Sequence, residues 1–233
     1  MTLAEHRSQF AGIDMAGEAL LPDVSGALWW EAASTLIVSD LHLEKGSSYA
    51  ERGLFLPPYD TAATLAALTT AIARFMPRRV IALGDSFHDR RALDRIDPSD
   101  MAALLALQSG RNWLWIVGNH DVALEGILPG DHAAVLSEGG LTFIHEPSSK
   151  PSSGEIAGHL HPAAKVKGRG RGVRRRAFIT DGERMVMPAF GAYTGGLNCR
   201  DGAVEALFPR GFIALMMGDD RIYTVPQAHC WAD

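Results

Sequence analysis

Aspartate, asparagine and histidine side chains recur at the points where apolar runs of the sequence end. The five segments concerned read VSDLH (38–42), ALGDSFHD (82–89), IVGNHD (116–121), FIHE (143–146) and IAGHLHP (156–162). Six of the nine histidines lie in them, namely His42, His88, His120, His145, His159 and His161. Ligands of open α/β sheets bind just beyond the carboxyl ends of the strands, so these segments could build one site.

The donor types favour a catalytic metal site. Imidazole, carboxylate and amide groups cluster without a thiolate, which suits Mn, Fe or Zn, whereas Mg alone prefers more oxygen ligands. A structural zinc would more often use cysteine. No serine or cysteine stands in a nucleophile elbow, and no GxxxxGK[ST] phosphate loop is present. Residues two apart on an extended segment face the same side, so Asp40 and His42, like His159 and His161, can point into one site.

Strands and helices must position these segments. Apolar runs predict strands at 25–34, 34–40, 78–85, 112–121 and 140–146, and turn residues predict hairpins at 173–187 and 211–225. Helical spacing predicts a helix at 61–76 with Asp60 as its N-cap. A second helix is expected at 98–110, capped by Ser99 and stopped by Gly110. Strand–helix alternation followed by strands indicates an α/β fold with a β-rich second half.

Length and composition fit an ordinary globular protein. The chain has 233 residues and 47% hydrophobic residues. Its net charge of −5 does not suggest a general polyanion binder, so a basic patch would have to be local. Two cysteines without CxxC spacing fit a reducing compartment. We expect a cytoplasmic protein without a membrane partner, because no signal-peptide or membrane-spanning pattern is present. The Ser- and Pro-rich stretch 146–155 is expected to be a surface loop inside one domain.

The ordered set D-x-H, G-D, G-N-H-D, H and G-H-x-H, from about residue 35 to 162, resembles the calcineurin-like metallophosphoesterase superfamily. The resemblance implies a four-layer α/β/β/α sandwich forming a single domain over 1–233, with metal motifs at 38–162 and a β-rich half at 163–233. It also implies a role for each matching residue. Asp40, His42 and His161 would hold one metal, Asn119, His145 and His159 the second, Asp85 would bridge both, and His120 would contact the phosphate and assist the leaving group.

The implied chemistry is a two-metal phosphoryl displacement. Two cations ~3.5–4 Å apart can bind a bridging hydroxide and clamp a phosphoryl oxygen. Mn²⁺ is the expected metal, with Fe, Zn and Mg as alternatives. Asn119 is neutral, so it would coordinate without cancelling positive charge, and the site would attract a phosphate ester anion.

One segment departs from the superfamily pattern. G-D-x-x-D-R is frequent there, whereas this chain has His88 at the usual Asp position and Asp89 one position later. His88 would either support a ligand or contact substrate, or it is a histidine of a surface loop. The same alternatives apply to Asp89 and Arg90.

The late segment MPAFGAYTGGLN (187–198), with the earlier motifs, is similar to the bacterial DNA-ligase-associated metallophosphoesterases. That family is described as DNA-damage-response endonucleases or phosphodiesterases encoded beside a ligase and a helicase. The resemblance implies a nuclease that cleaves phosphodiester bonds in DNA during repair, with a ligase and a helicase as partners, and it leaves a homo-oligomer open. The alternatives are a small-molecule or nucleotide phosphoesterase on the same site, and a non-enzymatic nucleic-acid adaptor.

A basic segment follows the last metal motif. Residues 165–176 hold seven basic residues and no acid, among them Arg174, Arg175 and Arg176. At most ~14 Å of extended chain separates its start from His161. The segment is either a solvated edge strand or a contact for phosphate backbone, and we favour the second. Phe190 and Tyr193 could stack a base or simply pack.

Overall fold

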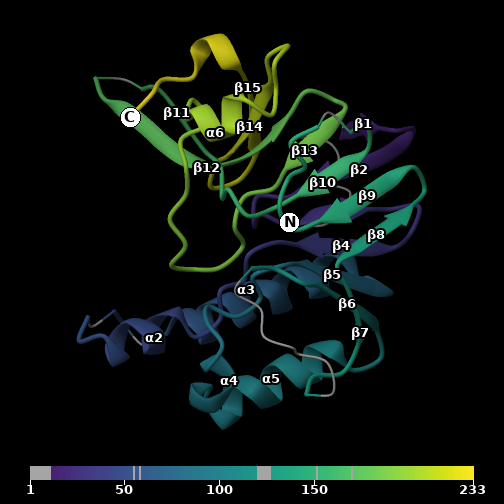
Figure 1. Cartoon of the computed structure of the whole chain (residues 1–233), viewed down its shortest axis with the longest axis vertical. Coiled ribbons are helices and arrows are strands. Elements are labelled where there is room, and N and C mark those ends of the chain that lie inside the picture. The colour runs from purple at the N-terminus through teal and green to yellow at the C-terminus, as the bar shows by residue number, and fades with distance from the viewer. Residues whose placement is uncertain (1–11, 55, 58, 120–126, 151, 169) are drawn as a thin grey trace.

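The computed structural model describes residues 12–54, 56–57, 59–119, 127–150, 152–168 and 170–233. Two β-sheets pack face to face at its centre (Figure 1). The helices are α2 (Lys45–Glu51), α3 (Asp60–Phe75), α4 (Ala92–Arg95), α5 (Pro98–Gln108), α6 (Gly202–Glu205) and the 3-10 helix η1 (Gln227–His229). The strands are β1 (Ile13–Met15), β2 (Glu18–Pro22), β3 (Leu28–Trp30), β4 (Thr35–Val38), β5 (Arg79–Leu83), β6 (Asn112–Ile116), β7 (Asp131–Ala133), β8 (Val135–Glu138), β9 (Leu141–Ile144), β10 (Glu155–Ala157), β11 (Ala163–Lys167), β12 (Gly172–Thr180), β13 (Arg184–Val186), β14 (Ile213–Met217) and β15 (Ile222–Pro226).

The first sheet runs in the order β1 to β7, and its strands β4, β5, β6 and β7 are parallel. Alternate residues of β4 point to opposite faces, so Leu36 packs on the helical side while Ile37 packs towards the second sheet. On the helical side, α3 contributes Leu65, Leu68 and Ile72 to the core. Both faces of the sheet are therefore buried, as its continuous apolar strands require.

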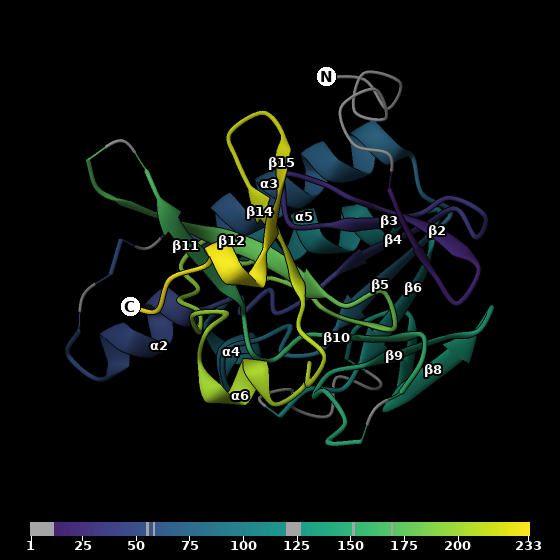
Figure 2. The same ribbon diagram turned by 90° about the horizontal axis from the view of Figure 1, so that it is seen from above.

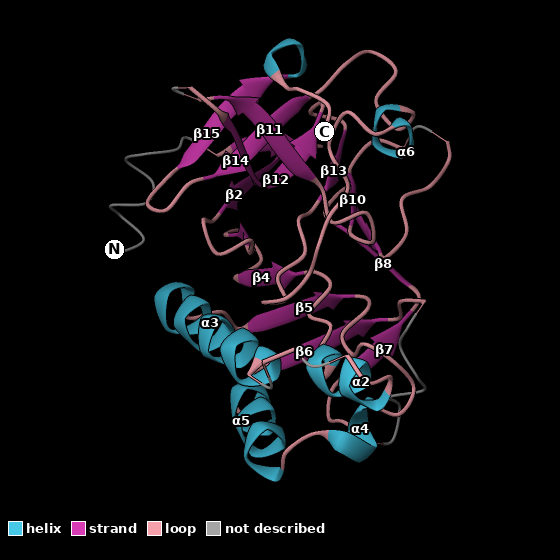
Figure 3. Ribbon diagram, turned by 90° about the vertical axis from the view of Figure 1, so that its left-hand side faces the viewer, coloured by secondary structure: helices cyan, strands magenta, loops and turns pink. Residues whose placement is uncertain are grey.

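The second sheet has the order β15-β14-β12-β13-β10-β9-β8, with β11 paired to β12. Its inner face contributes Phe143, Ile156 and Phe178 to the core between the sheets. Its outer face is covered by α6 and the C-terminal segments through Val204 and Phe208. Figure 3 shows the resulting order of layers, with α3, α4 and α5 at one end and the short α6 at the other. The predicted α/β/β/α sandwich is confirmed, although its last helical layer is reduced to one turn.

Several local predictions need correction. Asp60 is the first residue of α3 and Tyr59 is its N-cap; the carboxylate of Asp60 accepts a hydrogen bond from the backbone N–H of Gly46, 3.0 Å away. Asp97, not Ser99, caps α5, and it accepts the N–H of Ser99 at 2.8 Å. The helix α2 was not expected, since its sequence KGSSYAE has no apolar repeat. Among the described residues, no helix is both long and apolar enough to cross a membrane.

The basic segment forms a hairpin. Strands β11 and β12 pair antiparallel, with Lys165 opposite Arg174 and Ala163 opposite Arg176. The hairpin extends beyond the rest of the second sheet, because β12 pairs with β14 only from Ala177 onward (Figure 2). In the part of the chain that the structure describes, β11 pairs with β12 alone among the named strands, whereas β12 continues between β14 and β13. Only β11 is therefore an edge strand, and the use of 165–176 for phosphate contacts stays a prediction.

Candidate metal centre

Two groups of potential metal ligands lie at the ends of strands from both sheets. Their ligand atoms lie within 4.8 Å of one another in each group. The first group contains Asp40, His42 and His161, and the second contains Asp85, His145 and His159. The segments after β4 and β5 supply the aspartates and His42 from the first sheet. The segments after β9 and β10 supply the other histidines from the second sheet, so each group joins the two sheets.

The first group is compact and largely buried. Nε2 of His161 lies 3.1 Å from Oδ1 of Asp40 and 3.2 Å from Nε2 of His42. Burial lowers the pKa of His42 to about 3, and the charge of Asp40 only partly offsets this effect. His42 is therefore neutral at pH 7, which is the state that an imidazole needs to bind a metal.

Asp40 is held in place by its neighbours. Its Oδ2 atom accepts a hydrogen bond from the Ser39 hydroxyl at 2.5 Å and from the backbone N–H of His159 at 3.0 Å. Asp40 is fully buried. A buried carboxylate that is fixed in this way supplies a preoriented oxygen ligand.

The second group is centred on His145. Its Nε2 atom lies 3.2 Å from Nδ1 of His159 and 3.4 Å from Oδ2 of Asp85. Its Nδ1 atom lies 3.2 Å from the backbone oxygen of Leu83, which suits an Nδ1–H donor and leaves Nε2 for a metal. Burial opposes protonation of His145, but the hydrogen bond to Asp85 and the charges of Asp40 and Asp85 outweigh it and raise the pKa to about 9. The two carboxylates thus favour a positive charge at this place.

Asp85 lies between the two groups. Its Oδ2 atom is 3.9 Å from Nε2 of His42 in the first group and 3.4 Å from His145 in its own. Asp85 is 2% exposed, so water contributes little to its solvation. This position is compatible with the predicted bridging role of Asp85, which stays a prediction.

The backbone of the ligand segments is not extended, contrary to the sequence prediction. Asp40, His42, Asp85, His159 and His161 all have positive φ, from 44° to 69°. In these left-handed turns the backbone N–H of His42 donates to the carbonyl of Asp85 at 2.9 Å. Consecutive tight turns therefore bring Asp40 and His42 into the same ligand group. His159 and His161 belong to different ligand groups.

Glycines make room for the ligands. A Cβ atom on Gly84 would overlap the ring of His145, and one on Gly158 would overlap the side chains of Ser39 and Asp40. Gly118 approaches the backbone of Asp85 in the same way, so the segment after β6 passes directly beside Asp85. The glycines of G-D, G-N-H-D and G-H-x-H thus have a packing role.

Asn119 and His120, in the segment after β6, are the predicted metal ligand and the predicted proton donor. Asn119 is exposed and follows Gly118 in the segment beside Asp85, and its ligand role stays a prediction. His120, the predicted proton donor, lies outside the described residues.

His88 lies against the first ligand group. Its half-buried ring is 5.5 Å from that of His42 and 5.8 Å from that of Tyr49, measured between centroids. This placement favours a supporting or substrate-contacting role over a histidine of a surface loop. Asp89 instead forms an ion pair with Arg95 at 2.8 Å, and Arg90 is exposed.

The three predicted arginine contacts differ from one another. Arg176 is half-buried and donates to the carbonyls of Ala189 and Phe190 at 2.7 and 3.2 Å, so it anchors the segment after β13. Arg174 is exposed and donates to the carbonyl of Gly196 at 2.6 Å, and Arg175 is exposed. All three line one mostly polar hollow of about 420 Å³ together with the candidate ligand His161 and with Thr194, and we call it the inner hollow.

The two aromatic residues that could stack a base, Phe190 and Tyr193, differ in burial. Phe190 is 2% exposed and packs in the core on the helical side of the first sheet, so of its two alternatives the structure supports packing. Tyr193 is half-buried and keeps that prediction open. The sequence offered no sign of this difference, because both residues stand in the same Gly-rich stretch.

Comparison with known proteins identifies the family of the chain. Residues 33–183 match the family model of the calcineurin-like phosphoesterases. The chain belongs to this family and is a metal-dependent phosphoester hydrolase.

Three solved structures show different degrees of similarity to the chain. The chain is similar to the nuclease MPE of Pseudomonas putida, with 27% identity, a TM-score of 0.71, and coverage of 91% of this chain and 98% of that chain. The phosphoesterase Yfce of E. coli has 16% identity, a TM-score of 0.39, and coverage of 82% and 98%. A predicted phosphoesterase of Streptococcus pneumoniae TIGR4 has 13% identity, a TM-score of 0.30, and coverage of 84% and 90%. No curated protein matches the chain.

Proposed function

We propose that this protein is a two-metal phosphodiesterase that cleaves DNA, with Mn²⁺ as its metal. The observation that carries the proposal is the place of Asp85, whose carboxylate lies within 4 Å of a histidine of each ligand group. A single carboxylate between two sets of donors could contact both members of a pair of cations, as a two-metal site needs. The likeness to a bacterial nuclease over most of both chains supports a diester in DNA as the substrate.

The donor set fits two divalent cations. Asp40, His42 and His161 would hold one, His145, His159 and Asn119 the other, and Asp85 would contact both. Mixed imidazole and carboxylate ligands suit Mn, Fe or Zn. Two cations bound here would supply an activated water and the positive charge that stabilises phosphoryl oxygens during in-line displacement.

The remaining residues orient the ligands and the substrate. Ser39 and the backbone N–H of His159 fix the carboxylate of Asp40, and Leu83 fixes the ring of His145. His120 is proposed to donate the proton to the leaving oxygen, a role typically worth ~10²–10⁴-fold in rate.

The exposed arginines of the inner hollow support a polyanionic substrate. Arg174 and Arg175 line the same hollow as His161, so a strand whose scissile phosphate lies at the metals could place a neighbouring phosphate near them. Phosphate contacts position a nucleic acid without reading its sequence, so we propose cleavage with little sequence preference. A role in DNA repair beside a ligase and a helicase, in the cytoplasm, is part of the same proposal.

One assay panel tests the proposal. The metal-stripped protein is supplied with Mn, Fe, Zn or Mg and given single-stranded DNA, duplex DNA, a cyclic nucleotide, a chromogenic phosphodiester or a chromogenic phosphomonoester. We expect hydrolysis of DNA and of the chromogenic diester with Mn. Hydrolysis of the monoester or the cyclic nucleotide alone would replace the proposal by a small-molecule phosphoesterase. Absence of hydrolysis with every metal would refute it.

A further inference from the structure

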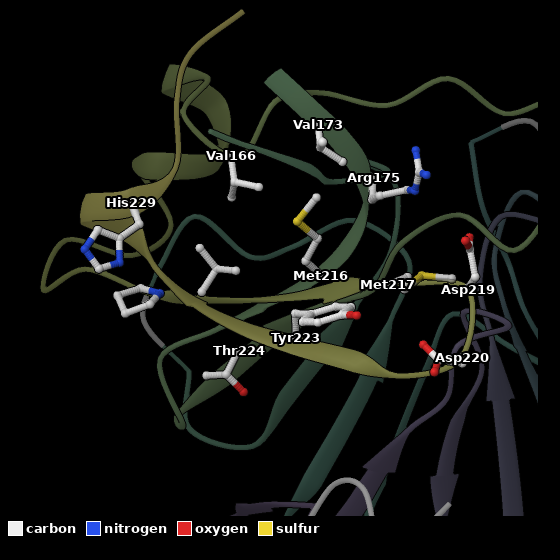
Figure 4. A pocket seen from close by; sticks show the side chains of 13 residues that line it. Val166, Val173, Arg175, Met216, Met217, Asp219, Asp220, Tyr223, Thr224 and His229 are labelled. Carbon is white, nitrogen blue, oxygen red and sulfur yellow. The ribbon is translucent and has the colours of Figure 1, made fainter. Parts of the chain in front are cut away.

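A second hollow, of about 530 Å³, lies on the outer face of the second sheet (Figure 4). We call it the outer hollow. Its apolar lining includes Val166, Val173, Met216 and Val225, with the ring of Tyr223 beside them. Arg175 and the acidic pair Asp219 and Asp220 complete one end.

Strand register explains why these side chains share one face. Met216 lies opposite Tyr223 in the β14–β15 pair and opposite Ala177 in the β12–β14 pair. Residues two apart along a strand point the same way, so Arg175 and Val173 face the same side as Ala177 and Met216. Arg174 and Arg176 face the other side of the hairpin, towards the inner hollow. The side chain of Arg175 thus points away from those of its two neighbours.

The two hollows share a border. Arg175, Met217, Gly218 and Asp219 line both of them. The ladder between β12 and β14 ends at the pair Ala177 and Met216, so Arg175 lies level with the turn that joins β14 to β15. The two hollows therefore adjoin where Arg175 lies beside this turn, so a ligand that occupies the inner hollow lies next to the outer one.

Tyr223 is held in place but open to a ligand. Its side chain is 50% exposed. A Cβ atom on Gly218 would lie 2.5 Å from Cε2 of the Tyr223 ring, so the ring edge packs where Gly218 has no side chain. The turn beneath it is closed by a hydrogen bond of 2.8 Å from the N–H of Gly218 to the carbonyl of Arg221. An exposed aromatic ring in a fixed position is suited to stack on another ring.

We propose that the outer hollow binds a nucleobase of the DNA strand whose scissile phosphate lies at the metals. The volume lies within the usual range of ligand pockets, and the lining is apolar as a stacked base requires. Asp220 is paired with Arg221 at 3.2 Å, whereas Asp219 lines both hollows and its carboxylate can accept a hydrogen bond from the amino group of a base. Arg175 at the border can contact the phosphate between the two hollows. The proposal rests on the proposed function, because it needs a DNA strand at the metal site.

A scan with abasic residues tests the proposal directly. Single-stranded DNA is prepared with one ordinary phosphodiester among phosphorothioate linkages, so that the cleavage position is fixed, and one base is removed at each position in turn. We expect the KM to rise about 5- to 100-fold at one position or two adjacent positions, which is the usual gain from stacking a base. This rise in KM on removal of a base should vanish in the Tyr223→Ala variant and persist in the Tyr223→Phe variant. Tyr59→Ala, an exposed tyrosine at the start of α3, is the matched control and should keep the position effect.

The outcomes separate this inference from the proposed function. For each variant, the kcat/KM on DNA is divided by the kcat/KM on the chromogenic phosphodiester, which carries no base. This ratio removes any general loss of activity at the metal site. Failure of the wild-type protein to cleave DNA would overturn the proposed function first, and the nucleobase site with it. Cleavage of DNA with a flat abasic scan would overturn the nucleobase site alone and leave the outer hollow to another occupant, such as a protein partner. A second variant, Val173→Trp, fills the hollow without removing Tyr223, and it should also flatten the scan.

Discussion

Oδ2 of Asp85 lies 3.9 Å from Nε2 of His42, although these two residues belong to different ligand groups and follow different strands. The contact joins the groups into one centre. It also makes Asp85 the residue whose loss should affect both groups at once.

We therefore expect Asp85→Asn to lower the metal content from two ions per chain to one or none, and to reduce hydrolysis of the chromogenic diester at least ~100-fold, because the bridging charge is lost. Metal content is measured by elemental analysis and folding by circular dichroism. Asp94→Asn is the control, since Asp94 is 74% exposed on α4. Two bound ions and full activity in the Asp85 variant would refute the two-metal assignment.

Gly84→Ala should damage the second ligand group. Gly84 has a φ of 73°, and its Cβ atom would overlap the ring of His145. Gly110 has nearly the same φ, 74°, with nothing near its Cβ position. Gly110→Ala therefore carries the backbone strain without the clash. Titration with Mn²⁺ should show one fewer strong site in the Gly84 variant alone; equal metal binding by both variants would contradict the packing role.

His120→Asn should keep both metals and lower turnover by ~10²–10⁴-fold, the usual contribution of a general acid. The loss should be smaller for a diester with a good leaving group, which needs less protonation. Comparison of kcat for such a diester and for DNA checks this. A normal kcat on DNA would remove His120 from the acid role.

Arg175 and Arg176 should differ in function, with Arg175 contributing to DNA binding and Arg176 to stability. Arg175→Gln should reduce the slope of log affinity against log salt by about 0.7 for single-stranded DNA, the value for one lost phosphate contact. Arg78→Gln, at the amino end of β5 away from the candidate ligands, should leave the slope unchanged. An unchanged slope in Arg175→Gln would indicate a merely solvated strand.

Arg176→Gln should instead lower stability. Arg176 donates to two backbone carbonyls, and hydrogen bonds that involve a charged group are worth about 1.5–3 kcal/mol. Urea denaturation of this variant and of the exposed Arg78→Gln measures the difference. Equal stability of the two would show that Arg176 does not anchor the segment after β13.

A buried ion pair away from the metals gives a separate test of the fold. Nη2 of Arg184 lies 3.2 Å from Oε1 of Glu155, and both side chains are less than 5% exposed. Arg184→Met should cost about 3–5 kcal/mol, because it leaves Glu155 buried without its cation. The double variant with Glu155→Gln should recover part of that loss. A loss below about 1 kcal/mol in the single variant would contradict the burial of this pair.

Much of the framework could be predicted from local sequence patterns. Strands β4, β5, β6 and β9 fall within their predicted ranges because each is a short apolar run bounded by polar residues. The hairpin predictions at 173–187 and 211–225 are also confirmed, since Asp181-Gly182 and Gly218-Asp219 mark the turns. Helix α2 and the pairing of β11 with β12 were not predicted, because neither shows a clear hydrophobic period.

The predicted ligand residues are brought together, but the reason differs from the one expected. A strand-end location is local information, whereas the left-handed backbone at Asp40 and Asp85 depends on hydrogen bonds between distant segments, such as the N–H of Asp40 to the carbonyl of Gly84. The separate roles of Arg174, Arg175 and Arg176 follow from strand register and from contacts with the segment after β13. Neither the strand register nor these contacts can be read from a run of like charges in the sequence.

Both ligand groups need a histidine from the segment after β10, which has consequences during synthesis of the chain. A chain that ends before residue 159 contains Asp40, His42, Asp85 and His145, yet it can complete neither group. Since ribosomes make proteins from the amino end, every unfinished product up to that length lacks a full set of ligands. A truncated product released before that length therefore lacks a complete ligand group of either kind.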